Sequence, residues 1–162
     1  FDMHSVWTML GMFSSCKGLT HIDVSKFNTE NVKSMQAVFQ NCENLSSLDL
    51  SGFNTSKVKD IACMFASCKS LTSLDLSNFD TQLVTQSTSL FFKCQKLEAI
   101  YLGDKFSLEG LSKLEASDYM FSNCLATLYC SPAAYWASKN CSRVKEAGQA
   151  VKPYGSINKT SE

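Results

Sequence analysis

The sequence lacks the features that mark several large functional classes. Lysine plus arginine and aspartate plus glutamate both number 15, so the formal net charge is zero, and no basic run is present. We therefore expect no nucleic-acid partner. No stretch approaches the roughly 18 consecutive apolar residues of a membrane-spanning helix, so we expect no membrane insertion. With 44% hydrophobic and 19% charged residues, the 162-residue chain predicts one globular domain and not a disordered chain.

Residues for common catalytic and metal sites are also scarce. The histidines are His4 and His21 alone. His21 and Asp23 would share one face of a sheet, which resembles half of a catalytic dyad, but no matched nucleophile is evident. Neither a Cys-x-x-Cys pair nor a calcium loop with its glycine spacing occurs. The sequence therefore predicts a protein that is not an enzyme and that has no catalytic residue, metal or cofactor.

What the sequence has is a 26-residue period. A fixed period of roughly 20–50 residues is typical of solenoids, in which successive units stack and equivalent residues form columns. Units begin near residues 1, 27, 53 and 79, and an irregular fifth unit begins near residue 106. Three residue types recur in register: Cys16, Cys42, Cys68 and Cys94; Phe13, Phe39, Phe65 and Phe91; and Leu19, Leu45, Leu71 and Leu97.

Each unit has two halves with different patterns. The first half of the second unit has the spacing of one helix face, which predicts a helix over residues 29–40 with Asn28 as its N-cap. In the second half, Leu48 and Leu50 alternate with polar residues, which indicates a strand with one buried face. We therefore predict an α/β fold over residues 1–131. It would be a leucine-rich-repeat-type solenoid of about five coils, each with one strand and one helix, and with a parallel sheet on one face. The residues on the predicted helix face are Val32, Met35, Val38 and Phe39.

The two ends of the chain differ from the regular units. Ser131 and Pro132 form a helix-start signal, and the spacing after them predicts a C-terminal capping helix over residues 132–148. The polar stretch 149–162 predicts a tail or linker. At the other end, Phe1 already belongs to the repeat pattern. We therefore expect either that further repeats precede this chain or that a protein that is otherwise a monomer pairs through this uncapped end.

The eight cysteines fall into two groups. The first group, which we predict to form a column of buried reduced thiols, is Cys16, Cys42, Cys68, Cys94 and Cys124. Residues in such a column lie about 4.8 Å apart, which could approach disulfide range, but inward-facing periodic cysteines behave better as small hydrophobic residues. Cys63, Cys130 and Cys141 break the period and are better disulfide candidates. A Cys130–Cys141 bond could join the cap to the last strand.

The most regular stretch of the sequence resembles a known repeat. Residues 64–77 read M-F-A-S-C-K-S-L-T-S-L-D-L-S, and the pattern M-F-x-x-C-x-x-L-x-x-L-D-L-S recurs in register. This pattern is similar to the 26-residue leucine-rich repeats of BspA-like bacterial surface proteins, over residues 1–105 and more loosely over 106–131. The resemblance implies a repeat solenoid on a secreted or surface-anchored protein, with an extracellular or cell-surface location and an adhesin-type function. It supplies no catalytic motif.

The outer face of the predicted sheet is the candidate binding surface. Its small polar residues suit an extracellular protein or a glycan, which makes the chain a binding module. A second hypothesis stays open, in which the solenoid is a structural spacer that displays another domain and has no ligand of its own. The aspartates of this face would either recruit Ca²⁺ or be satisfied by backbone amides and neighbouring serines and threonines, which we favour. The candidate ligand-binding residues are His21, Asp23, Ser47, Asp49, Ser73, Asp75 and Tyr101.

Overall fold

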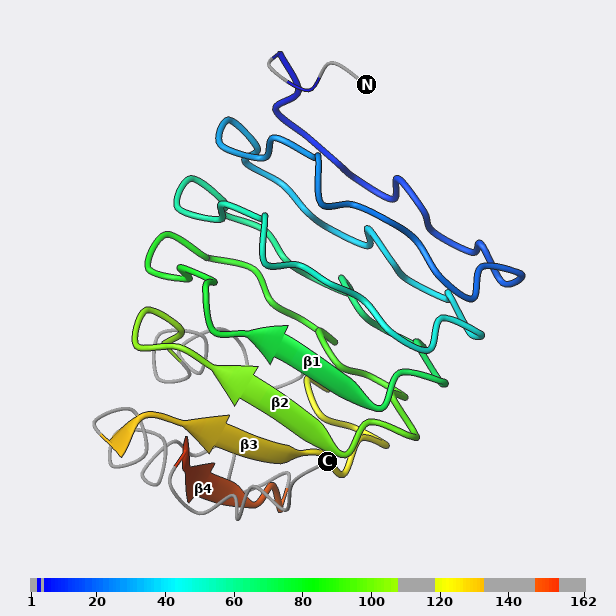
Figure 1. Cartoon of the computed structure of the whole chain (residues 1–162), viewed down its shortest axis with the longest axis vertical. Helices are drawn as coiled ribbons and strands as arrows, with labels where there is room; N and C mark the ends of the chain where they lie inside the picture. The colour runs from blue at the N-terminus through cyan, green and yellow to red at the C-terminus, as the bar shows by residue number, and fades with distance from the viewer. Residues whose placement is uncertain (1–2, 4, 108–118, 133–147, 155–162) are drawn as a thin grey trace.

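The computed structural model describes residues 3, 5–107, 119–132 and 148–154. Within these ranges the regular elements are four strands in one parallel sheet, ordered β1-β2-β3-β4 (Figure 1). The register between β1 and β2 is 26 residues, so that Leu74 lies beside Ile100. The strands are β1 (Ser73–Leu76), β2 (Ala99–Leu102), β3 (Thr127–Cys130) and β4 (Val151–Pro153).

Each 26-residue unit makes one turn of the chain, here called a coil, and successive coils lie side by side along the long axis (Figure 1). The stretch 48–50, which we predicted as a strand, and its equivalent 22–24 in the first coil lack the paired backbone of a strand. They keep the predicted alternation of side chains, since Val24 and Leu50 are buried while Asp23 and Asp49 are exposed. The burial pattern of the sheet therefore extends over more coils than the hydrogen-bonded sheet itself.

The prediction of a helix over residues 29–40 is wrong. The amides of Met35, Ala37 and Phe39 donate to carbonyls of the next coil, at 2.8, 2.9 and 3.0 Å, whereas helix amides donate to carbonyls four residues earlier. Ala37 and Asn41 have φ angles of 56° and 58°, in the left-handed region that a right-handed helix excludes. Residues 5–107 contain no helix. The bonds within this half of a coil are isolated turns to the third residue earlier, such as Gln40 to Ala37, and the alternate amides between them pair with the next coil.

A second parallel alignment joins the coils on the half opposite the sheet. It consists of isolated bridges spaced 26 residues apart, at Thr8, Ser34, Asp60 and Gln86. The left-handed residues recur at the same period, so this half repeats one backbone conformation from coil to coil. The residues with positive φ are Gly11, Ala37, Cys63 and Ser89 at the first position and Ser15, Asn41, Ser67 and Lys93 at the second.

The phenylalanines form the column that the period predicts. Phe39 and Phe65 stack with ring centroids 6.1 Å apart and an interplanar angle of 6°, and Phe65 and Phe91 stack at 5.9 Å and 3°. The column continues to Phe13 at 5.6 Å and, in the fifth unit, to Phe121 at 5.4 Å. Each buried ring contributes roughly 1.5–3 kcal/mol by leaving water, and stacking adds about 0.5–1.5 kcal/mol. The predicted sharing of one column by like side chains is confirmed here.

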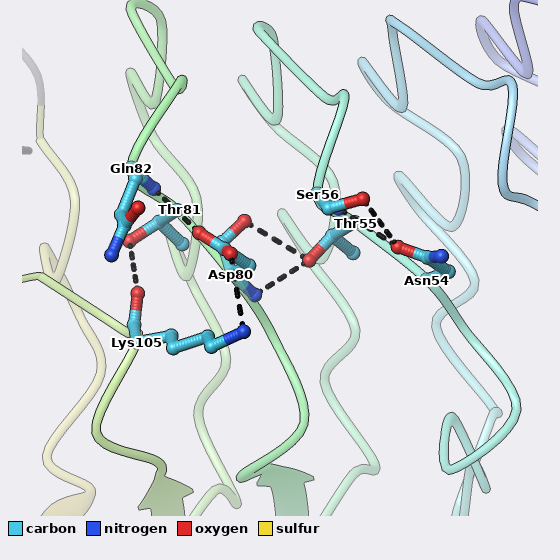
Figure 2. A network of polar contacts seen from close by, with 7 residues as sticks. All are labelled: Asn54, Thr55, Ser56, Asp80, Thr81, Gln82 and Lys105. Atoms are coloured by element: carbon cyan, nitrogen blue, oxygen red, sulfur yellow. Dashed lines mark hydrogen bonds and ion pairs between the residues drawn. The ribbon is translucent and has the colours of Figure 1, made fainter.

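A column of buried threonines, Thr29, Thr55 and Thr81, holds the coils together by polar contacts. The Thr55 hydroxyl donates to the carbonyl of Asp80 at 3.0 Å and accepts from the amide of Asp80 at 2.7 Å (Figure 2). Thr29 makes the same pair of bonds to Asn54 one coil earlier, at 3.0 and 2.8 Å. The hydroxyls of Thr29 and Thr55 therefore each satisfy both backbone groups of one residue in the next coil, and the Thr81 hydroxyl donates to the Lys105 carbonyl and accepts from the Ser107 amide. These bonds fix the spacing of the coils at this point.

The C-terminal region differs in part from the prediction. The segment 149–162 was predicted as a polar tail, but Val151–Pro153 forms β4 and extends the sheet beside β3. Gln149 is buried, and its side-chain amide donates to the Cys124 carbonyl at 2.6 Å. This segment forms a strand because its backbone amides and carbonyls pair with those of β3, which would otherwise stay unpaired at the edge of the sheet. Residues 133–147, most of the predicted capping helix, lie outside the described residues.

Candidate functional site

The seven residues that we selected as ligand-binding candidates lie on the outer face. All are exposed except Tyr101, which is half-buried: His21, Asp23, Ser47, Asp49, Ser73, Asp75 and Tyr101. The sheet pairing sets Asp75 beside Tyr101, and Tyr101 in turn beside Tyr129. The structure therefore places two of the predicted residues, Asp75 and Tyr101, in direct register on adjacent strands.

The three aspartates of this face stabilise turns. Each carboxylate accepts the backbone N–H of the serine two residues later at 2.9 Å, in the pairs Asp23–Ser25, Asp49–Ser51 and Asp75–Ser77. Hydrogen bonds from the Ser25 hydroxyl and backbone lower the pKa of Asp23, and those from the Ser51 backbone and hydroxyl lower the pKa of Asp49. These contacts agree with the expectation that backbone amides and neighbouring serines satisfy the aspartate carboxylates. In the described part of the chain, no three acidic, histidine or cysteine side chains are grouped so that they could hold a metal ion.

Three cysteines of the predicted column lie inside the coils and donate to carbonyls of the preceding coil. The thiols of Cys42, Cys68 and Cys94 each lie 3.1 Å from the carbonyl of a column phenylalanine. Burial raises the pKa of Cys42 to about 11 and the pKa of Cys68 to about 12, and it raises the pKa of Cys94 further. Cys124 is also buried, and burial raises its pKa. These protonated thiols are structural groups and not nucleophiles.

The first cysteine of the column is an exception. Cys16 is exposed, so its prediction as a core residue is wrong. The reason is its position in the first coil. Each of the next three column cysteines is covered by the coil before it and donates to the carbonyl of a phenylalanine 29 residues earlier, whereas the described residues place no such coil against Cys16.

The cysteines that break the period have different environments. Cys63 is half-buried and forms no disulfide, so its selection as a disulfide candidate is wrong. Its thiol faces the Thr88 carbonyl at 3.7 Å, and burial raises its pKa. Cys130 is buried at the end of β3. Its predicted partner Cys141 lies outside the described residues.

A hollow of about 530 Å³ lies where the carboxyl ends of β1 and β2 meet the residue that follows β4. Sequence reasoning identified Asp75 and Tyr101, but it missed Asp104 and Tyr154 because neither occupies a position singled out by the period. The hydroxyl of Tyr154 donates to the Leu102 carbonyl, which fixes the ring at the edge of the hollow. The lining residues are Asp75, Ser77, Tyr101, Gly103, Asp104, Ser131 and Tyr154.

The hollow coincides with a departure from the repeat. Tyr101 stands where the earlier coils have an aspartate, and Gly103 stands where they have a serine. A Cβ atom on Gly103 would lie 1.8 Å from the carbonyl oxygen of Ser77, so the two backbones pack together without space for a side chain. Burial raises the pKa of Tyr154, and so do the negative charges of Asp75 and Asp104. Both carboxylates line the same hollow as the phenol.

Two further surface features lie away from this hollow. A second hollow, of about 510 Å³, lies toward the amino ends of β1 and β2 and is lined in part by Thr72, Glu98 and Leu125. Trp7 and Leu10 are exposed on the first coil. Within the ranges that the structure describes, no helix has the length and apolar character needed to cross a membrane.

Comparison with known proteins identifies a family for this chain. No curated protein and no solved structure matches the chain. A family model described as "Mycoplasma protein of unknown function, DUF285" matches residues 1–104, which is more than half of the 162 residues and covers the regular coils. The chain therefore belongs to the DUF285 family.

Proposed function

We propose that this chain is a leucine-rich-repeat-type solenoid of a BspA-like surface protein and acts as a binding module at the cell surface or outside the cell. Its ligand would be a protein or a glycan, held on the outer face of the sheet. Membership of the DUF285 family, the 26-residue register and the exposed polar face support this proposal. The helices of the sequence prediction are not part of it, because residues 5–107 contain none.

The observation that carries the proposal is the hollow beside Tyr101. The regular coils repeat the same outer residues, and a natural protein that breaks a local rule tends to do so at a functional site. Here the repeat changes at Tyr101 and Gly103, and the same place contains a cavity, two carboxylates and aromatic rings. Aromatic surface combined with a few convergent polar groups is typical of ligand sites.

Catalysis is not part of the proposal. His21 and Asp23 are both exposed, and the Asp23 carboxylate accepts the Ser25 amide. A general base needs a nucleophile within hydrogen-bond reach, and this pair has no matched serine or cysteine in the sequence pattern. Turnover that disappears in a His21→Ala variant would contradict this part of the proposal.

The test is a binding screen followed by substitutions on the outer face. The full chain would be applied to a glycan array and to immobilised extracellular-matrix proteins. We expect a ligand whose affinity falls in a variant that combines Asp49→Asn, Ser73→Ala and Asp75→Asn. Asparagine keeps the oxygen that accepts the turn amide, so folding should be preserved. Lys57→Ala is the control, because Lys57 lies in the first half of its coil. Unchanged affinity in the combined variant would contradict the sheet-face site.

The alternative is a structural spacer that displays another domain. The turn-forming role of Asp23, Asp49 and Asp75 favours it, since these residues have a structural purpose without any ligand. Clean negatives for all glycans and proteins in the screen would support the spacer. We propose that the protein is a monomer in either case. If two copies pair, we expect them to meet at the first coil, where Trp7 and Leu10 are exposed.

A further inference from the structure

Tyr101 lines the hollow, and Tyr129 stacks on one face of its ring. Tyr129 packs on Tyr101 with centroids 5.3 Å apart and an interplanar angle of 20°. The sheet order places Asp75 on the opposite side of Tyr101. Aspartate is too short to cover a tyrosine ring, and its carboxylate is drawn toward the Ser77 amide. The second face of the Tyr101 ring is therefore available at the hollow.

The charged side chains around this ring are carboxylates, which accept hydrogen bonds. A carboxylate offers about four lone-pair positions, and the Ser77 amide occupies one of those on Asp75. Asp104 supplies a second carboxylate from an exposed position after β2. The residues that line the hollow include no lysine, arginine or histidine. A ligand that fits must therefore donate hydrogen bonds and must lack negative charge, because the carboxylates would repel an anion.

The walls of the hollow are fixed by the fold. The Tyr154 hydroxyl bonds to the Leu102 carbonyl, and Gly103 packs directly against the backbone of Ser77. A site with fixed walls loses little conformational entropy when a ligand binds. The volume of about 530 Å³ lies within the roughly 300–1,000 Å³ that is usual for small-molecule sites.

We propose that this hollow is a subsite for a pyranose unit of an uncharged glycan. The apolar C–H face of the sugar would pack on the free face of Tyr101, and its hydroxyls would donate to Asp75 and Asp104. Charge-assisted hydrogen bonds of this kind are about twice as strong as neutral ones. The inference rests on the proposed function as a binding module, and it narrows the ligand from a protein or glycan to an uncharged glycan.

The experiment compares uncharged and anionic glycans on one array, with the full chain as the probe protein. The uncharged panel contains neutral hexose and N-acetylhexosamine oligosaccharides, and the anionic panel contains sialylated and sulfated ones. The strongest uncharged oligosaccharide would then be titrated by calorimetry. We expect Tyr101→Ala and Asp75→Asn each to weaken binding about tenfold or more. Asp60→Asn is the matched control, because the Asp60 carboxylate accepts the amide two residues later in the same way but lies on the half of the coil opposite the sheet, so affinity should be unchanged.

The outcomes separate this inference from the proposed function. Binding confined to anionic glycans or to a protein would overturn the sugar subsite and leave the binding module in place. The same holds if an uncharged oligosaccharide binds to Tyr101→Ala and to Asp75→Asn with the affinity that it has for the unsubstituted chain. A chain that binds nothing would overturn both. Should Tyr101→Ala fail to fold by circular dichroism, Asp75→Asn decides the matter, since asparagine preserves the turn.

Discussion

Replacing Thr55 by valine removes one hydroxyl and nearly preserves the shape of the side chain. Thr55 is 2% exposed, and its hydroxyl makes two bonds to the backbone of Asp80 (Figure 2). Each bond contributes roughly 0.5–1.5 kcal/mol net, and a buried backbone group left without a partner costs about 1–3 kcal/mol. Valine would leave both the N–H and the C=O of Asp80 without this partner. We expect the free energy of unfolding to fall by about 2–4 kcal/mol.

The measurement is chemical denaturation followed by circular dichroism, with two controls. Thr55→Ser keeps the hydroxyl and loses one methyl group, so it should cost about 1 kcal/mol. Thr72→Val changes an exposed threonine and should fall within about 0.5 kcal/mol of the parent. If Thr55→Val destabilised the protein no more than Thr72→Val, the threonine column would not hold the coils together. A change in the denaturant slope would show that the variant had altered the compactness of the unfolded or native state, or had broken two-state unfolding.

Three further predictions concern the packing of Gly103 and the burial of the column cysteines. Gly103→Ala should lower the free energy of unfolding by about 2–3 kcal/mol, because the added Cβ would be overpacked against Ser77. Gly18→Ala should be near neutral, because its Cβ would meet nothing within 4 Å. Equal shifts of the unfolding temperature in the two variants would refute this prediction. In native protein, iodoacetamide should modify the exposed Cys16 and spare Cys42 and Cys68 until the chain unfolds, as peptide mass mapping would show; equal rates at all three would contradict their burial. The free energy of unfolding should decline as pH rises from 9.0 to about 12, because burial raises the pKa of Cys68 and the unfolded chain therefore loses that proton first. A decline of the same size in a Cys68→Ala variant would rule out this thiol as the cause.

The period predicted which residues face inward better than it predicted the backbone that holds them. Val32, Met35, Val38 and Phe39 are all fully buried, as their spacing indicates. That spacing fits one helix face, but it fits equally a segment whose amides pair with the next coil. The difference lies in the left-handed conformations of Ala37 and Asn41, which side-chain periodicity does not encode. The threonine column was readable in principle, because Thr29, Thr55 and Thr81 also recur every 26 residues.

The candidate site could be predicted only in part. Asp75 and Tyr101 belong to a column that the period defines, so sequence reasoning reached them. Tyr154 reaches the hollow from the end of β4, and the three residues of that strand are too few to give an alternating pattern. Asp104 follows the strand at a position where earlier coils have unrelated residues. Long-range packing brings Asp104 and Tyr154 to the site, and the sequence around each residue contains no pattern that predicts this position.

The central claim is that residues 26 apart in sequence are neighbours in adjacent coils. Nuclear Overhauser spectroscopy on protein with labelled phenylalanine rings tests it most directly. Contacts are expected between Phe39 and Phe65 and between Phe65 and Phe91, whose ring centroids lie 6.1 and 5.9 Å apart, but not between Phe39 and Phe91. Rings of Phe39 and Phe65 that show no mutual contact, and contact unrelated residues instead, would contradict the stacking of coils and the surface built on it.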